Sequence, residues 1–195
     1  TDTLTVTGSV SGSFAANFDE CNQSTNNGSQ TAAKSFTTWK YATGGAETIS
    51  IVASATPTAM IAQSFELDGV PASNAEDTAV WACNGATGAT ISPTVTSGSV
   101  SEADELLLSV YGRPGNNSGF TFTDDAAHGW AQTGACGGNT SVTYCPSVAT
   151  PSTGANIHNP TTTSAGYAMA TIGFKSASPA PSTSGSRAAL LGVGR

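Results

Sequence analysis

One apolar run constrains the fold of this chain more than any other stretch of its sequence. Residues 106–111 (Leu-Leu-Leu-Ser-Val-Tyr) form its longest aliphatic segment, and a Gly/Pro/Asn cluster ends that segment at 112–117. A buried strand of a β-sandwich has this length and this kind of boundary. Residues 120–123 (Phe-Thr-Phe-Thr) alternate with a period of two, which predicts a strand with one face in the core and one in water. The unit ends at Trp130 and indicates an all-β fold.

The rest of the chain repeats this pattern of short apolar or alternating runs between turn residues, which is typical of an antiparallel sandwich or barrel with about ten short strands. The predicted strands are 4–8, 36–41, 47–53, 59–67, 80–82, 89–91, 94–96, 106–111, 120–123, 141–144 and 166–175. The runs 36–41 and 47–53 flank Gly44-Gly45, which predicts a hairpin between them. The stretch from Cys145 to Ala165 is rich in Pro, Ser, Thr and Asn and is predicted to be a loop.

Length and composition favour one domain with an appended tail. A chain of 195 residues fits a single all-β domain, which we place at 1–176. Residues 177–195 begin with a Pro/Ser/Gly-rich tether and end in an apolar arm, 187–195. The arm either docks on a neighbouring subunit or frays as a free terminus. Apolar side chains at the two ends are the candidates for docking on a partner: Leu4, Val6, Leu190, Leu191 and Val193.

The scarcity of charge argues against several classes of partner. Charged residues make up 10% of the chain, against about 25% in an average domain. The six Lys and Arg residues are scattered and the net charge is −7, so we expect no binding to nucleic acid. No apolar run approaches the ~20 residues that span a bilayer, so we expect no membrane insertion. The first residues also lack the charged and apolar regions of a signal peptide.

Four cysteines predict two disulfides. Cys136 and Cys145 flank a Gly-Gly-Asn loop and a short strand-like segment, which indicates a local hairpin staple. Cys21 and Cys83 then pair by elimination, although four cysteines allow three connectivities. A zinc site is the alternative, but it needs C-x₂₋₄-C pairs that are absent. Bridged cysteines imply maturation outside a reducing cytosol, and free buried thiols remain the other interpretation.

Candidate chemical groups gather in one part of the sequence. His128 and His158 are predicted in separate loops, and Asp124 or Asp125 could orient either one beside a serine. No G-x-S-x-G elbow exposes a nucleophile, so we expect no enzymatic activity. The Asp124-Asp125 pair could instead bind a Ca²⁺ ion in a loop, since hard cations take oxygen ligands, although no EF-hand spacing is present. We otherwise expect no cofactor and no bound metal.

A sugar site would need exposed aromatic side chains. Most Trp and Tyr residues lie within strand patterns, where packing in the core is the ordinary role of a large aromatic. Trp130, between Gly129 and Ala131, is the candidate for a ligand-binding aromatic, with Asp124 and Asp125 as neighbouring polar groups. Core packing of Trp130 is the alternative.

Four ordered segments resemble a known family. They are the aromatic strand and "ATG" turn at 39–45, the small-residue strand that ends in Gly69-Val70, the acidic turn before Leu-Leu at 99–112, and the Phe120 to Trp130 spacing with the closing strand 168–175. In this order they resemble jelly-roll, concanavalin-like accessory domains of phage structural proteins and bacterial surface proteins. The resemblance implies a jelly-roll sandwich used for adhesion or virion decoration, without catalysis.

The expected function follows from this resemblance and from the composition. We expect a virion accessory protein, such as a capsid decoration, spike or tail-associated subunit, that contacts copies of itself and a capsid or tail protein. It would stabilise the particle or contact a glycan of the host surface. The alternatives are a secreted or cell-surface carbohydrate-binding module and an extracellular filament subunit that completes a neighbour's sheet with its N-terminal strand.

Overall fold

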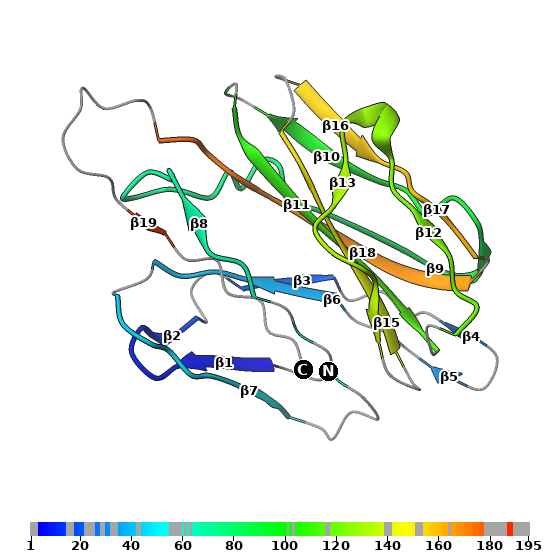
Figure 1. The fold of residues 1–195 in the computed structure, drawn as a ribbon, viewed down its shortest axis with the longest axis horizontal. Helices are drawn as coiled ribbons and strands as arrows, with labels where there is room; N and C mark the ends of the chain where they lie inside the picture. The colour runs from blue at the N-terminus through cyan, green and yellow to red at the C-terminus, as the bar shows by residue number, and fades with distance from the viewer. Residues whose placement is uncertain are drawn as a thin grey trace.

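The computed structural model consists almost entirely of antiparallel β-structure (Figure 1). It describes residues 4–14, 18–21, 26–27, 30–31, 35–41, 44–54, 60, 62, 64–100, 102, 104–115, 118–138, 142–150, 154–163, 165–177 and 187–188. In these ranges ten strands have four or more residues and nine have two, and the one helix is a single 3-10 turn. The prediction of an all-β fold is therefore confirmed. The jelly-roll order of strands stays a prediction.

A central antiparallel sheet organises the molecule, with the strand order β13-β15-β11-β18-β9. Its members are β13 (Ala131–Gln132), β15 (Val142–Ala149), β11 (Leu106–Pro114), β18 (Ala165–Phe174) and β9 (Ala82–Thr90), and the short β14 (Gly137–Gly138) also pairs with β15. The run singled out from the sequence is β11, at the middle of this sheet. It is almost continuously buried because layers cover both of its faces.

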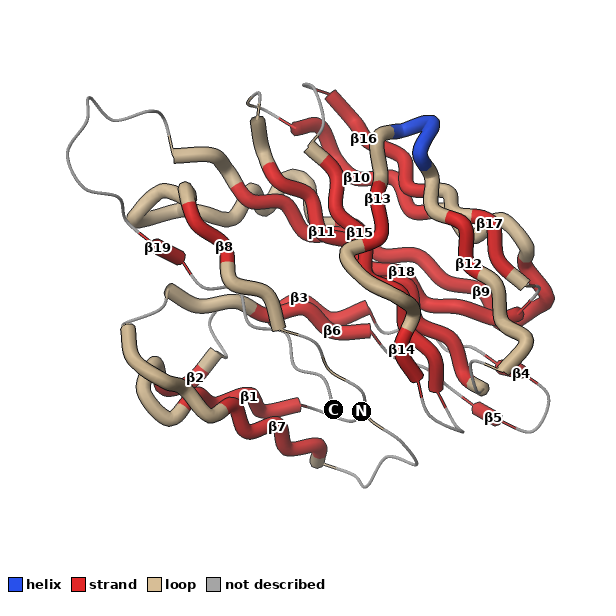
Figure 2. Tube along the Cα trace, in the orientation of Figure 1, coloured by secondary structure: helices blue, strands red, loops and turns tan. Residues whose placement is uncertain are grey.

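Alternate residues of β11 serve two different cores. Leu108 points toward a cluster that contains Trp39, Val70, Ile172 and Phe174. Leu107 and Tyr111 point to the other side. There the sheet is covered by β10 (Val95–Val100) paired with β16 (Gly154–His158), and by β12 (Phe122–Thr123) paired with β17 (Thr161–Thr162). The 3-10 helix η2 (Ala126–His128) lies beside β16 (Figure 2).

The remaining strands of the described residues form smaller sheets. In Figures 1 and 2 the β3–β6 pair lies between the central sheet and the β2-β1-β7 sheet. The bounds are β1 (Leu4–Gly8), β2 (Gly12–Ser13), β3 (Phe18–Cys21), β4 (Asn26–Asn27), β5 (Gln30–Thr31), β6 (Ser35–Thr38), β7 (Ile49–Ala53), β8 (Leu67–Asp68) and β19 (Arg187–Ala188). β4 pairs with β5, and β8 pairs with β19.

Three predicted local structures differ from the observed ones, because pairing with distant strands overrides local turn signals. The Gly44-Gly45 loop does not join a hairpin: β6 pairs with β3, and β7 pairs with β1. The predicted loop from Cys145 to Ala165 contains most of β15, all of β16 and β17, and the first residue of β18. His158 therefore lies at the end of a strand. The predicted strand at 59–67 is also shorter in the described residues, where only Leu67 of that range lies in a strand, β8.

Other sequence predictions are confirmed. Phe120 and Phe122 are half-buried while Thr121 and Thr123 are exposed, as the alternation predicted. The acidic turn before β11 folds inward, and the buried Glu105 carboxylate accepts the backbone N–H of Glu102. The closing strand predicted at 166–175 is β18.

A close backbone approach fixes the segment before β9 against the core. A Cβ on Gly98 of β10 would lie 1.7 Å from the carbonyl oxygen of Ala79, so only glycine fits there. A Cβ on Gly173 of β18 would lie 2.9 Å from the Val80 side chain. The turn at 77–80 therefore bridges two strands that belong to different layers.

The hairpin staple is confirmed. Cys136 and Cys145 form a disulfide with their Cα atoms 4.4 Å apart. Cys83 is also disulfide-bonded, and the side chain of Cys21 lies outside the described residues. None of the described cysteines is a free thiol.

Candidate functional site

A row of hydroxyl groups crosses the inner face of the central sheet. Ser109 of β11 lies directly opposite Ser147 of β15 on one side and Thr171 of β18 on the other. All three are buried. Two residues before and two residues after Ser109 on β11 lie Leu107 and Tyr111. Each of them belongs to an apolar cluster. The sandwich core thus contains one polar layer between two apolar layers.

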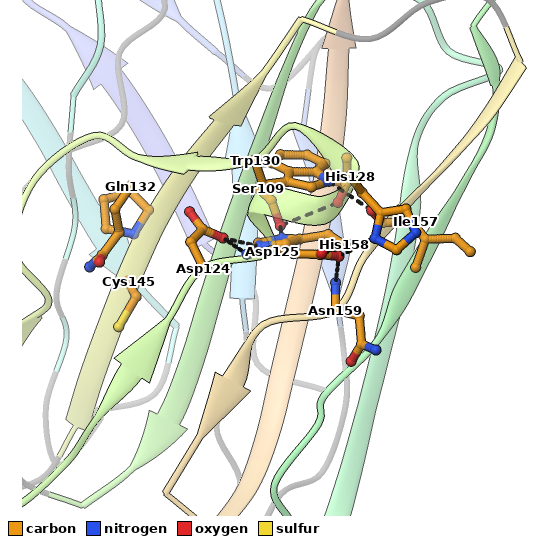
Figure 3. Close-up of polar contacts among 12 residues, drawn as sticks. Ser109, Asp124, Asp125, His128, Trp130, Gln132, Cys145, Ile157, His158 and Asn159 are labelled. Carbon is orange, nitrogen blue, oxygen red and sulfur yellow. Dashed lines mark hydrogen bonds and ion pairs between the residues drawn. The ribbon is translucent and has the colours of Figure 1, made fainter.

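His158, at the end of β16, meets this row from the opposite layer. Its ring is fully buried, and its two nitrogens have different partners. Nδ1 lies 2.7 Å from the Ser109 hydroxyl, and Nε2 lies 2.7 Å from Oδ1 of Asp124 (Figure 3). The Thr171 hydroxyl donates to Ser109 at 3.3 Å. We call these four side chains, together with Ser147, the polar layer.

The partners determine the direction of the hydrogen bonds. An ionised Asp124 can only accept, so His158 Nε2 donates to it. In the neutral imidazole Nδ1 is then the acceptor and the Ser109 hydroxyl the donor. Protons therefore point in one direction from Thr171 through Ser109 and His158 to the Asp124 carboxylate. Such a chain strengthens its members in a low-dielectric core.

The environment of Asp124 favours its charged form. Burial alone would raise the pKa of its carboxyl. The hydrogen bond from His158 and the backbone N–H of Asp125 outweigh this effect and hold the pKa below its ordinary value. The polar layer therefore contains a carboxylate at neutral pH.

A second His–Asp pair lies next to the first. Asp125 is buried, and its carboxylate accepts from Nδ1 of the half-exposed His128, with Oδ2 at 2.7 Å. The same Oδ2 accepts the backbone N–H of Asn159 at 2.7 Å. Trp130 Nε1 donates to the carbonyl oxygen of Ile157 at 2.8 Å. The 124–130 loop therefore satisfies backbone groups at the end of β16 with side chains, which protects part of that strand from other pairing.

Trp130 belongs to the core and not to an exposed ligand site. Its side chain is 2% exposed, and its ring stacks on His158 with centroids 4.2 Å apart. The ring also packs with Leu107, Val80 and Val100. Sugar binding by stacking needs an exposed ring face, so the expectation that Trp130 contacts a glycan is corrected by its burial.

The polar layer contains the three residue types of a Ser-His-Asp triad, but its geometry differs from that of a working nucleophile. Ser109 is 1% exposed and lies at the middle strand of the sheet. A substrate carbonyl must come within about 3–3.5 Å of the attacking oxygen, and the layers on both faces of the sheet close that approach. The geometry supports a structural role for the network.

The paired carboxylates are engaged by histidines and backbone N–H groups. Asp124 accepts from His158, and Asp125 accepts from His128, so each carboxylate pairs with one imidazole. In the described part of the chain no group of three or more His, Cys, Asp or Glu side chains is arranged to hold a metal ion. The residues proposed as a loop Ca²⁺ site thus have other partners.

The predicted partner-docking residues fall into two groups. Val6 is buried at 6% exposure within the β2-β1-β7 sheet, where β1 has neighbours on both edges. Leu4 begins β1 and pairs with Ala53, and its side chain lies outside the described residues. The other three candidates, Leu190, Leu191 and Val193, also lie outside them.

Sequence reasoning missed the residues that complete the layer. Ser109 and Thr171 are two hydroxyl residues in a chain full of them, and only strand register brings them to His158. One local signal was available: Ser109 interrupts the apolar run 106–111 at a position that faces the core. A polar residue inside a buried strand predicts a buried partner.

Comparisons with protein-family models, curated proteins and solved structures found no match for this chain. Among the described residues, no helix has the length and apolar character to cross a membrane.

Proposed function

We propose that this protein is a non-enzymatic structural subunit of a particle, namely a virion accessory protein that decorates a capsid, spike or tail. The observation that carries the proposal is the polar layer. The side chains best suited to chemistry, Ser109, His158 and Asp124, are used to join the two layers of the core. Their burial favours a protein that acts through its shape and surface.

The resemblance to jelly-roll accessory domains supports the virion assignment. The remaining features are compatible with an extracellular particle: a disulfide at the Cys136–Cys145 hairpin, few charges, and a net charge of −7 that disfavours polyanions. The partners would be further copies of the chain and a capsid or tail protein. Host glycans would be contacted by the assembled particle.

The two alternatives need features that the described residues do not offer at the predicted positions. A carbohydrate-binding module would need an aromatic platform other than Trp130, whose ring is buried. A filament subunit that donates its N-terminal strand would have to release β1, which already lies between β2 and β7.

The test is the location of the protein in the culture that produces it. Virus particles purified by density and the cleared supernatant are digested without reduction, and the peptides are quantified by mass spectrometry. We expect peptides of this chain at a fixed ratio to the major capsid protein through every purification step, with the Cys136–Cys145 bridge intact. Peptides found only in the supernatant or on cell envelopes would overturn the virion assignment and favour a secreted module.

A further inference from the structure

Residues 187–188, the described part of the C-terminal arm (187–195), pair with one strand of the body, β8. β19, the first part of the arm, pairs antiparallel with it, so that Arg187 lies opposite Asp68 and Ala188 lies opposite Leu67. Figure 1 shows β19 beside β8, apart from the central sheet. Among the described strands β8 has no other partner. The arm therefore completes a sheet that the rest of the described chain leaves with one strand.

β8 is fixed to the core independently of the arm. The Leu67 side chain is buried in the cluster that contains Val70, Leu108 and Phe174. The turn after β8 has Gly69 at φ 76°, and the Gly69 N–H donates to the Asp68 carboxylate. The acceptor strand is thus held by side-chain packing and a turn, neither of which needs β19.

The segment that connects β18 to the arm has many more residues than the pairing of β19 with β8 requires. After β18 the Ala177 N–H donates to the carbonyl oxygen of Gly69 at 2.6 Å. Residues 178–186 follow, and Arg187 then lies opposite Asp68, the neighbour of Gly69 in sequence. The connection therefore starts and ends at adjacent positions. Nine residues reach up to about 30 Å when extended, and the Pro/Ser-rich composition of this stretch favours extension.

We propose that β8 is the acceptor for the C-terminal arm of a second copy of this chain, so that subunits are linked by exchange of their arms. The inference rests on the proposed function, because it supplies the contact by which the subunits would assemble. An exchanged arm makes the same backbone pairing with β8 as the chain's own arm, and the connection has the reach to deliver it. Exchange of an identical element is a low-cost route to association.

Concentration decides which pairing forms. The nine-residue connection (178–186) holds the chain's own arm at an effective concentration on the order of millimolar. Dilute protein is therefore closed and monomeric, and copies held side by side on a particle exchange arms. This separates the proposal from ordinary dimerisation, in which the isolated subunits associate through fixed surfaces.

The test uses cysteines at the directly opposed pair of positions 68 and 187. Asp68 is exposed, so its replacement removes the acceptor of the Gly69 N–H but leaves the buried contacts of Leu67, which hold β8 to the core, in place. One chain carries Asp68→Cys and a second carries Arg187→Cys, and the two are mixed at about 1 mM, the range of the competing effective concentration, under mild oxidation. We expect a covalent heterodimer, mapped by mass spectrometry to the 68–187 bridge. A chain carrying both substitutions should close on itself at micromolar concentration.

The control pair is Asp68→Cys mixed with Ser118→Cys, an exposed position outside β8 and β19. The proposal is overturned if the double variant closes while the mixed chains give no more heterodimer than this control pair. It is also overturned if the double variant does not close, because the β8–β19 pairing is then absent. Cross-linking of purified chains does not depend on where the protein is found, whereas the particle proteomics does, so the two proposals fail separately.

Discussion

The coupling between His158 and Asp124 is the most direct prediction of the polar layer. His158→Phe keeps a ring against Trp130 but removes the donor to Asp124, and Asp124→Ala removes the acceptor of His158 Nε2. Each single change leaves the other member of the pair buried without its main partner. The double variant leaves neither group behind. The pair therefore predicts strong non-additivity in the free energy of unfolding.

The structure sets the expected magnitudes. Removing one partner of a buried hydrogen bond to a carboxylate leaves the other polar group unsatisfied, at a cost of about 1–3 kcal/mol and more for a charged group. Asp124 keeps the backbone N–H of Asp125, so we expect about 3 kcal/mol for His158→Phe. Asp124→Ala should cost about 2–3 kcal/mol, the penalty of an orphaned buried donor. The double variant should lose about 3 kcal/mol instead of the sum of about 5–6 kcal/mol, which is a coupling of about 2–3 kcal/mol.

Urea denaturation followed by tryptophan fluorescence measures this cycle, and each kcal/mol corresponds to about 2–4 °C in Tm for a domain of this size. His128→Ala is the matched control, because His128 is half-exposed in its pair with Asp125 and should cost less than about 1 kcal/mol. Additive losses within about 0.5 kcal/mol would refute the interpretation of the pair as a buried, interdependent unit.

The same pair has a defined pH dependence. The pKa of Asp124 is lowered on folding, so its contribution to stability is complete above the unfolded value of about 3.9 and is lost as the pH falls through the lower folded value. Asp124→Asn keeps an acceptor for His158 but cannot titrate. Its unfolding free energy should therefore fall less steeply below about pH 4 than that of the parent chain.

Three further predictions concern the fold. Gly98→Ala should destabilise by about 2 kcal/mol or more, because its Cβ would lie 1.7 Å from a backbone oxygen, whereas Gly134→Ala, which meets nothing within 4 Å, should change the unfolding free energy by less than about 1 kcal/mol. Replacing both Cys136 and Cys145 by Ala should cost about 2.6 kcal/mol in the chain-entropy account of a bridge with a sequence separation of 9. Reduction of the parent chain, which also opens the bridge at Cys83, should lower the Tm further than this double replacement does. Burial raises the pKa of Tyr111 to about 12, so stability should fall between pH 10 and 12 as the unfolded phenol ionises first, and Tyr111→Phe should flatten that part of the urea-denaturation profile.

The sequence predicts well wherever local pattern and burial agree. The apolar run at 106–111 is the central strand β11, the closing strand is β18, and the alternating 120–123 segment lies half in the core. In these segments the hydrophobic pattern of the local sequence is sufficient to predict the strand. The hairpin around Gly44-Gly45 could not be predicted reliably from local pattern. Two strand-like runs on either side of a glycine turn pair with each other only when no better partner strand exists elsewhere in the chain. Here β1 and β3 are the better partners.

The candidate site was predicted only in part. Asp124, Asp125 and the two histidines stood out because these residue types are rare in a chain with 10% charged residues. Their pairing, His158 with Asp124 and His128 with Asp125, depends on β16 passing over the central sheet. The sequence placed His158 in a loop, so neither its burial nor its contact with Ser109 could be inferred.

A buried polar layer in an otherwise apolar core also explains why this sandwich has one register. Along the inner face of β11, Leu107, Ser109 and Tyr111 follow one another, and in this register the Ser109 hydroxyl is the group that lies within hydrogen-bond distance of His158 Nδ1. A slip of two residues would keep the face apolar but place the imidazole against Leu107 or the Tyr111 ring. It would leave a buried nitrogen unpaired, at a cost of about 1–3 kcal/mol. With an apolar residue in place of His158, a slipped register would no longer leave a buried nitrogen unpaired. The free-energy difference between the two registers would then be smaller. The polar layer therefore selects one alignment of the two layers of the sandwich.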